Sequence, residues 1–394
     1  MGRLYTSEAV CVGHPDKVCD QISDAILDAY LKGDPYSRVA CESAAKTGIV
    51  FLAGEITSKA VVNLADVTRE TIREIGYCDP DLGFDYKSCG IIISVDRQSP
   101  DIALGVDENA ARGKELGAGD QGIMYGYACR ETPVLMPMPI HLARALVNRL
   151  REAREKKELA YLRPDGKAQV TVVYEGNRPT RVHTIVVSTQ HSPEVPLEKL
   201  RKEVEDVIIR RAIPANLLDP KVILHINPTG RFVEGGPKAD SGLTGRKIIV
   251  DTYGGLAHHG GGAFSGKDAT KVDRSAAYAA RHAAKNLVAA GIADRCEISL
   301  AYAIGVAQPV AINIDTFGTS KLSEEKISDA VRKAFDFRPG AIIDYYKLRR
   351  PIFKRTAREG HLGIEHPEAT WESLEKAEEL KQLLGSKQSV GVSL

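Results

Sequence analysis

Hydrophobic and polar residues follow a helical rhythm near the start of the chain. Val18, Ile22 and Ile26 recur four residues apart within residues 16–31, which predicts an amphipathic helix. The next stretches carry strand and helix patterns in turn. They predict strands over residues 38–41 and 48–56, a helix over 59–75 and a strand over 90–95.

The order helix, strand, strand, helix, strand recurs twice more, at a spacing of roughly 125 residues. The second round predicts helices over residues 140–157 and 197–213 with strands over 169–174, 182–189 and 222–226. The third predicts helices over 273–290 and 324–335 with strands over 297–306 and 309–317, and it shows no evident closing strand. This repetition favours an α+β fold of three similar modules, each a mixed sheet with its helices on one face. Coincidence is the alternative, because many α+β proteins share this order of elements.

Size and composition fit such a fold and narrow the classes of function. The chain of 394 residues has room for two or three domains, and 43% hydrophobic with 27% charged residues is ordinary for a globular protein. A net charge of +1 argues against nucleic acid or a membrane as the partner, and no apolar run approaches the ~18 residues of a membrane span. Seven scattered cysteines without a C-x-x-C pair, and no signal peptide before the first strand, indicate a cytoplasmic location.

Residues 260–275, between the second and third modules, concentrate glycine and charge. The segment reads GGGAFSGKDATKVDRS: four glycines, followed from residue 267 by two lysines, an arginine and two aspartates. Glycines let the backbone approach a ligand and turn its N–H groups inward. Ammonium groups suit phosphate oxygens and carboxylates suit a divalent ion, so the segment predicts binding of a nucleotide triphosphate. A flexible surface turn is the alternative.

The same segment also resembles a P-loop, because Gly261 to Lys267 fits the pattern G-x-x-x-x-G-K. In a true P-loop the next residue is Ser or Thr, whose hydroxyl binds magnesium, but here it is Asp268. The nearest predicted strand, over residues 247–253, ends too early to lead directly into the loop. The segment therefore fits phosphate binding well and a P-loop badly.

The first predicted helix opens with residues 13–17, which read GHPDK. Pro15 suits the first helical turn, and a helix N-terminus favours anions. His14 can donate to a phosphate or bridging oxygen, Asp16 can hold a cation and Lys17 can counter negative charge. A simple helix cap is the alternative for this motif.

Other carboxylates and turns are weaker signals when each is taken alone. Asp20, Asp24 and Asp28 lie one turn apart on the first helix, and we expect a solvated face there rather than a metal site. Glu42 and Glu55 lie at the ends of two predicted strands. Charged, glycine-rich turns recur at residues 117–122, 227–232, 235–240 and 245–247. The chain has no G-x-S-x-G elbow, no H-E-x-x-H motif and no evident Cys/His pair, so its chemistry need not pass through a covalent protein intermediate.

Three of these motifs together resemble the S-adenosylmethionine synthetase (methionine adenosyltransferase) family, most closely its bacterial branch. They are GHPDK at 13–17, GAGDQG at 117–122 and GGGAFSGKD at 260–268. The resemblance runs over nearly the whole chain and includes residues 46–48, 227–232 and 244–255. The nine-residue glycine motif is highly specific, and the order of the three motifs leaves little room for another family.

This resemblance implies a reaction in which the thioether of L-methionine attacks C5′ of ATP. The whole triphosphate leaves and is then cleaved to pyrophosphate and phosphate. A thioether needs no general base, so alignment with C5′ is expected to supply ~7–11 kcal/mol. Magnesium, lysines and backbone amides would stabilise the charge on the leaving oxygen. Two alternatives stay open: a phosphoryl-transferring ATPase or kinase that uses residues 261–267, and a non-catalytic ATP-binding homologue.

The resemblance also implies a role for each matching residue. The implied catalytic residues are His14, Asp120, Lys167, Asp240 and Lys267. Contacts to ATP are implied for His14, Asp165, Lys167, Arg231, Phe232, Asp240, Arg246, Lys247, Ala263 and Lys267, and contacts to methionine for Glu55, Gln98, Asp240 and Lys271. The implied metal ligands are Asp16 and Asp273 for Mg²⁺, with two ions per site, and Glu42 for K⁺. Residues 98–108 resemble the mobile lid of the family.

The implied fold consists of three similar α+β domains about a pseudo-threefold axis. We expect an N-terminal domain over residues 1–101, a central domain over 113–231, a C-terminal domain over 232–372, and a helix end with a mobile tail over 373–394. The resemblance implies a homodimer or homotetramer with shared active sites. One departure concerns Cys11 and Val12, which stand where the family usually has Ser-Glu.

Overall fold

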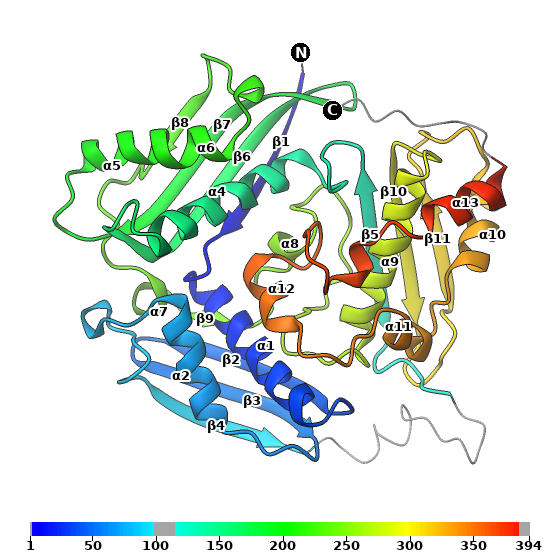
Figure 1. Cartoon of the computed structure of the whole chain (residues 1–394), viewed down its shortest axis with the longest axis horizontal. Coiled ribbons are helices and arrows are strands. Elements are labelled where there is room, and N and C mark those ends of the chain that lie inside the picture. The colour runs from blue at the N-terminus through cyan, green and yellow to red at the C-terminus, as the bar shows by residue number, and fades with distance from the viewer. Residues whose placement is uncertain (1, 98–114, 386–394) are drawn as a thin grey trace.

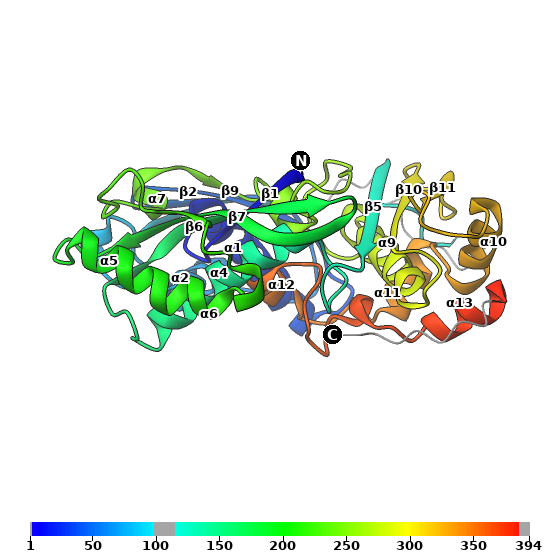
Figure 2. The ribbon, with the colours of Figure 1, turned by 90° about the horizontal axis from the view of Figure 1, so that it is seen from above.

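The computed structural model describes residues 2–97 and 115–385, and these form three β-sheets with helices packed against one face of each (Figure 1). Seen from above, the molecule is elongated, with strands along one long side and helices such as α6, α12 and α13 toward the other (Figure 2). The predicted lid over residues 98–108 lies outside the described residues.

The first sheet follows the predicted order of elements. Its strands, across the sheet, are β4 (Gly90–Asp96), β3 (Ile49–Thr57), β2 (Arg38–Lys46) and β9 (Gly242–Leu243). Its helices are α1 (Pro15–Gly33) and α2 (Leu64–Ile75). Strands β2 and β3 form an antiparallel hairpin, and β4 runs parallel to β3. The helix α2 begins five residues later than predicted, because the Asn63 side chain caps it.

The second sheet has the same plan. Its strands are β1 (Arg3–Val10), β6 (Leu162–Glu175), β7 (Arg178–His191) and β8 (Ile223–Ile226), with β7 and β8 parallel and the other pairs antiparallel. Its helices are α4 (Met138–Glu155) and a continuous segment made of α5 (Leu197–Glu203), a π-helical stretch (Val204–Ile209) and α6 (Arg210–Ala212). The hairpin strands are longer than the sequence pattern predicts.

The third sheet lacks a closing strand among the described residues. Its strands are β11 (Ala311–Asp315), β10 (Arg295–Tyr302) and β5 (Gly122–Cys129), all antiparallel, and its helices are α9 (Val272–Ala289) and α10 (Glu324–Ala334). The chain continues instead into short helices α11 (Pro339–Tyr345), α12 (Phe353–Glu359) and α13 (Ala377–Leu384). The predicted α+β class with three similar sheet-and-helix units is confirmed.

Each sheet takes one edge strand from a distant part of the chain, and we call β1, β5 and β9 the borrowed strands. Strand β9 joins the sheet of the N-terminal third, β1 joins the sheet of the central third, and β5 joins the sheet of the C-terminal third. Each borrowed strand adjoins one predicted site motif. His14 follows β1, Asp120 precedes β5, and Lys247 follows β9. Strand exchange therefore carries the motifs toward the junctions between sheets.

Helices α1 and α9 are buried over most of their length. Val18, Ile22 and Ile26 are fully buried, which confirms the helical pattern read from the sequence. Helix α9 is buried over nearly its whole length and packs against β5 and β10. Over residues 2–97 and 115–385, no helix has the length and apolar character needed to cross a bilayer.

Candidate active site

The N-terminus of α1 carries a buried histidine. His14 caps the helix: its Nδ1 accepts a hydrogen bond from the backbone N–H of Asp16 at 3.2 Å, and Pro15 occupies the first turn. Burial of the ring, reinforced by the charge of Lys247, lowers the pKa of His14 to about 3, so the ring is neutral. Because Nδ1 accepts a hydrogen bond, the proton lies on Nε2, and Nε2 is the atom able to donate to a ligand.

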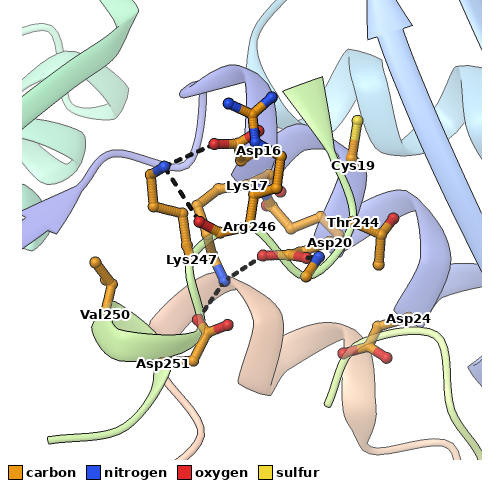
Figure 3. Close-up of polar contacts among 12 residues, drawn as sticks. Asp16, Lys17, Cys19, Asp20, Asp24, Thr244, Arg246, Lys247, Val250 and Asp251 are labelled. Carbon is orange, nitrogen blue, oxygen red and sulfur yellow. Dashed lines mark hydrogen bonds and ion pairs between the residues drawn. The ribbon is translucent and has the colours of Figure 1, made fainter. Parts of the chain in front are cut away.

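Two cations reach the same helix end from the loop that follows β9. Lys247 Nζ lies 2.7 Å from Asp16 Oδ2, and Arg246 Nε lies 3.7 Å from Asp16 Oδ1 (Figure 3). The backbone N–H of Leu243 donates to Asp16 Oδ1 at 3.0 Å. Burial opposes ionisation of Asp16, but the hydrogen bonds from Lys247 and Leu243 outweigh it and hold its pKa below the ordinary value. The carboxylate is therefore charged, and it fixes this loop to the start of α1.

Strand β6 brings a third cation to the helix end. Lys167 lies opposite Val10 of β1 in the antiparallel ladder, and β1 leads directly into the turn that holds His14. Lys167 is exposed, and its charge acts on the pKa of His14 together with that of Asp240. The predicted residues His14, Asp16, Lys167, Asp240 and Lys247 therefore share one region of the molecule.

Asp165 gives this region an unsatisfied acceptor. Its burial raises its pKa to about 6, and its Oδ2 accepts the backbone N–H of Gly236 at 2.8 Å. Its Oδ1 is buried and has no hydrogen-bond partner within the described part of the chain. The ring of Phe232 lies near the same turn, since a Cβ added at Gly235 would approach it to 2.9 Å. A buried acceptor beside an aromatic ring suits a ligand that stacks and donates a hydrogen bond.

The glycine-rich segment forms a second cationic loop at the start of α9. Lys267 Nζ lies 2.6 Å from Oδ2 of Asp273, which belongs to the first turn of that helix. The loop runs along β2, where the backbone N–H of Cys41 donates to the carbonyl of Gly266 at 3.0 Å. The N-terminus of α9 favours negative charge, so this loop presents both an ammonium group and a positive helix end to a ligand.

The two cationic loops touch each other. A Cβ added at Gly245, the residue before Arg246, would lie 2.5 Å from the Cβ of Ala263 in the glycine-rich segment. The absence of a side chain at Gly245 therefore allows the close approach. The cations on the two loops consequently border one continuous region.

The glycine-rich segment does not have the frame of a P-loop. Residues 247–253, predicted as a strand, contain the helix α8 (Ile248–Asp251), so that prediction is wrong. Asp268, at the position where a P-loop has Ser or Thr, is buried and accepts the backbone N–H of Val39 at 2.8 Å. It also pairs with Lys271 at 2.5 Å. Asp268 therefore anchors the loop to β2.

Glu55, Glu42 and Asp120 lie close to these loops. Ala40 pairs with Glu55 on one side and bridges to Lys267 on the other, so Glu55 lies one strand away from Lys267. Glu42 lies on β2, two residues after Ala40, and its side chain is exposed. A Cβ added at Gly119 would lie 2.6 Å from the carbonyl oxygen of Thr270, which places the turn of Asp120 beside the start of α9. Arg231 is exposed, and Gln98 lies outside the described residues.

The acidic face of α1 has a role that the sequence pattern did not indicate. We expected Asp20, Asp24 and Asp28 to be solvated, and this is wrong, because Asp20 and Asp24 are fully buried and Asp28 is half-buried, with its carboxylate bound to the backbone of α12. Lys17 is also buried. Its ammonium group pairs with Asp20 at 3.0 Å and with Asp251 at 2.8 Å, and it therefore neutralises protein carboxylates rather than a bound phosphate (Figure 3). No local signal distinguishes such a row from a surface row, because its partners come from loops more than 200 residues away.

The fold and the site together define a class of protein: a three-sheet α+β protein with cationic, glycine-rich loops at the N-termini of two helices. Family models of S-adenosylmethionine synthetase match the chain in order, with the N-terminal domain at residues 2–100, the central domain at 115–232 and the C-terminal domain at 234–373. The S-adenosylmethionine synthase of Clostridium botulinum (strain Alaska E43 / Type E3) is 58% identical over 391 residues, which are 98% of this chain and 100% of that protein.

The chain therefore belongs to the S-adenosylmethionine synthetase family, as its motifs predicted. Its activity is that of a methionine adenosyltransferase, which forms S-adenosylmethionine from L-methionine and ATP. The kinase and the non-catalytic homologue considered from the sequence are thereby set aside.

Proposed function

We propose that the two cationic loops and the N-terminus of α1 hold the triphosphate of ATP while the methionine sulfur attacks C5′ in line. The contact between Gly245 and Ala263 carries this proposal, because it joins the loop of Lys247 to the loop of Lys267. His14 Nε2 would donate to the bridging oxygen at C5′ or to a phosphate, and the neutral state of the ring leaves this proton in place. The leaving triphosphate is then hydrolysed in the same site to pyrophosphate and phosphate.

The cations would act on the charge that develops as the triphosphate departs. Lys167, Arg246, Lys247 and Lys267 come from three separate segments and flank the same helix ends. Fixed ammonium and guanidinium groups need no reorganisation during the reaction, which is the usual source of large electrostatic stabilisation in enzymes. Arg231 and Ala263 would add contacts along the nucleotide. This arrangement stabilises the leaving group without a covalent intermediate.

The adenosine end would occupy the turn between Phe232 and Asp165. The aromatic ring of Phe232 offers a stacking surface, and the unpartnered Oδ1 of Asp165 offers an acceptor. The exocyclic amino group of adenine is a donor of the required kind. Asp120 and Asp240 are exposed carboxylates beside the two loops, and we assign them to the neighbourhood of the new sulfonium, where negative charge is favourable.

The methionine would lie on the side of Glu55. Glu55 is exposed one strand away from Lys267 and would take the substrate ammonium group. Lys271, in the segment that leads into α9, would take the carboxylate once it exchanges Asp268 for the substrate. Gln98 belongs to this pocket in the proposal and lies outside the described residues.

The carboxylates present fit magnesium that arrives with the nucleotide. Within the described ranges no group of three or more His, Cys, Asp or Glu side chains is arranged to hold a metal alone. Mg²⁺ commonly takes only one or two carboxylates and completes its shell with phosphates and water. Asp16 and Asp273 are such carboxylates, and each lies beside a lysine that binds phosphate in the proposal. They would hold two Mg²⁺ ions, which supply charge neutralisation for the leaving triphosphate.

We further propose that the chain works as a homodimer or homotetramer with shared active sites. Leu243, Ala44, Phe51 and Ile92 form one register row across all four strands of the first sheet, and Leu243, Phe51 and Ile92 are 40–51% exposed. Exposed apolar surface of this kind usually marks an interface. Glu42 and Glu55 follow on β2 and β3, so a second copy would cover them. Glu42 would then hold K⁺ together with oxygens from that copy.

We place the enzyme in the cytoplasm, with neither nucleic acid nor a membrane as a partner. All seven cysteines lie in the described ranges as free thiols, and six of them are buried. Unpaired buried thiols fit a reducing compartment. For the domains we retain residues 1–101, 113–231 and 232–372, followed by the end of the chain at 373–394, with the borrowed strands exchanged between the first three.

The products of one incubation test the proposed chemistry. The protein is incubated with ATP, Mg²⁺ and K⁺, with and without L-methionine, and the products are separated by mass spectrometry. The proposal predicts S-adenosylmethionine, pyrophosphate and phosphate only when methionine is present, and no ADP. Formation of ADP as the main product, or release of intact triphosphate without cleavage, would contradict it.

A further inference from the structure

Four aspartates on α1 form one row, which we call the aspartate ladder: Asp16, Asp20, Asp24 and Asp28. They recur every four residues and therefore lie on one face of the helix. Figure 3 shows the first three of them. Asp16, Asp20 and Asp24 are buried, and Asp28 is half-buried. Asp16 and Asp20 accept backbone N–H groups from the segment that contains and follows β9, Asp24 accepts one from the glycine-rich segment, and Asp28 accepts two from the start of α12. The ladder thus fastens three distant segments to one helix.

The two middle rungs hold the two cationic loops. Asp20 Oδ1 accepts the N–H of Gly245 at 2.8 Å, and Asp24 Oδ1 accepts the N–H of Gly266 at 2.8 Å. The residue after Gly245 is Arg246, and the residue after Gly266 is Lys267. Each rung therefore fixes the backbone one residue before a cation that we assign to the triphosphate.

The last rung fastens a segment with no assigned substrate contact. Asp28 accepts the N–H groups of Phe353 at 2.9 Å and Lys354 at 2.8 Å, both at the start of α12. It thus makes the same kind of contact as Asp20 and Asp24. The ladder offers its own control, because Asp28 leads to no phosphate-binding loop, whereas Asp20 and Asp24 each lead to one.

Buried partners make the middle rungs rigid. Lys17 pairs with Asp20, and Arg274 makes a two-atom contact with Asp24 at 2.7 and 2.9 Å. Arg274, which belongs to α9, also donates hydrogen bonds to the carbonyls of Phe264 at 2.9 Å and Lys267 at 3.2 Å. It therefore holds the glycine-rich segment against α9. A buried carboxylate that is both paired and hydrogen-bonded has little freedom to change its position.

We propose that Asp20 and Asp24 are positioning residues for triphosphate loss, because they set the spacing between the loops of Lys247 and Lys267 along α1. Neither carboxylate touches substrate in this scheme. They act through Gly245 and Gly266, and they keep both loops in register with His14 at the end of the same helix. The inference rests on the proposed roles of Arg246, Lys247 and Lys267.

The test compares Asp20→Asn and Asp20→Ala with the control Asp28→Ala. Asparagine keeps an oxygen that accepts the Gly245 N–H, whereas alanine removes it, and Lys17 keeps Asp251 as its partner in both. For each variant kcat, KM for ATP, KM for methionine and the rate of tripolyphosphate hydrolysis are measured per folded enzyme, with far-UV circular dichroism and Tm recorded in parallel. Asp24→Asn is measured in the same assays, as a variant of the second proposed positioning residue.

We expect Asp20→Ala to lower kcat and tripolyphosphate hydrolysis about 100-fold, the effect of a loop misplaced by about 1 Å. Asp20→Asn should recover at least about tenfold of that loss, and KM for methionine should change less than about twofold in both Asp20 variants. Asp28→Ala should keep kcat within about twofold while its Tm falls. Equal losses in Asn and Ala, equal losses at positions 20 and 28, or a kcat of Asp20→Ala close to the parent value would each overturn the proposal.

A separate variant distinguishes failure of this inference from failure of the proposed site. Lys267→Ala removes one of the assigned cations and leaves every rung of the ladder in place. If Lys267→Ala is severely impaired while the Asp20 variants are not, only the ladder inference is wrong. If Lys267→Ala turns over normally, the phosphate-binding roles themselves are wrong.

Discussion

Single residues in this site owe their properties to burial, and His14 is the clearest case. It is 3% exposed, and its pKa falls from 6.5 to about 3. In the unfolded chain the imidazole binds a proton below about pH 6.5, whereas in the folded protein it does so only near pH 3. The folded state therefore gains stability from His14 above pH 6.5, and this gain is lost as the pH falls from 6.5 toward 3.

We predict that His14→Asn makes the protein less sensitive to acid. Between pH 6.5 and pH 4 the parent should lose up to about 1.4 kcal/mol of unfolding free energy per pH unit through this one group, and the variant should lack that component. Thermal melts of both proteins at pH 7, 5.5 and 4 measure the difference. Parallel loss of Tm in the two proteins over this range would show that His14 does not carry the linkage.

Lys267 carries the second prediction at this scale. Its ammonium group pairs with Asp273 and lies at the positive end of α9, where a leaving triphosphate would gain most from a fixed cation. Lys267→Ala should lower kcat by well over ~100-fold, as expected when a charge partner of the transition state is removed. Steady-state kinetics measure it, with Lys202→Ala on the exposed face of α5 as the control. Near-normal turnover of Lys267→Ala would refute its role.

Among the elements, β5 and α9 depend on a close approach of backbones. Gly126 of β5 lies against α9, and a Cβ there would lie 2.0 Å from the carbonyl carbon of Ala280. The alanine-rich face of α9 leaves no large side chain that could move away. The borrowed strand β5 can therefore lie on α9 only if residue 126 has no side chain.

We predict that Gly126→Ala lowers the unfolding free energy by about 1–3 kcal/mol, the usual cost of overpacking a core. Gly90→Ala is the matched control, because a Cβ there would have no neighbour closer than 3.8 Å and the residue also lies in a strand. Urea denaturation of the three proteins gives the comparison. Equal midpoints for Gly126→Ala and the parent would mean that β5 can shift away from α9 at no cost.

For the whole molecule, the outward faces of the three sheets carry exposed apolar side chains. The row of Phe51 and Ile92 is exposed on the first sheet, and Ile123 and Leu4 are exposed on the borrowed strands of the other two. Helices lie against the opposite face (Figure 2). Exposed apolar surface of this kind usually marks an interface, and in our proposal a second copy covers it.

We predict that Phe51→Glu combined with Ile92→Glu reduces the mass in light scattering to that of a single chain and abolishes turnover, since the active sites are shared in our proposal. Val61→Glu, at a fully exposed apolar residue in the connection before α2, is the matched control and should keep both the assembly and the activity. A fully active single chain would contradict the sharing of sites, and an unchanged mass would contradict this interface.

The sequence predicted the helices and hairpins well because their signals are local. The spacing of Val18, Ile22 and Ile26 defines α1, and the three rounds of elements match three sheets with helices on one face. The partners of the borrowed strands are not local. Strand β9 is only two residues long, and nothing near residue 242 indicates that it pairs with Ala44 and Ala45. Pairing of this kind depends on long-range contacts that no local pattern encodes.

The site motifs were found from their glycine and charge content, but their supports were not. His14, Lys247 and Lys267 lie in turns with recognisable composition. Asp20 and Asp24 resemble a surface row until the loops at residues 245 and 266 are seen to cover them. Burial of a polar row is a property of the assembled molecule, so periodicity alone gave the wrong environment.

A crystal structure of the protein with tripolyphosphate and Mg²⁺ tests the central claim most directly. Our account predicts one triphosphate in contact with both cationic loops, with Lys247 and Lys267 on the same ligand and His14 at one end of it, within one subunit or across two. A triphosphate that contacts only one of the loops, or that binds away from the N-terminus of α1, would contradict it.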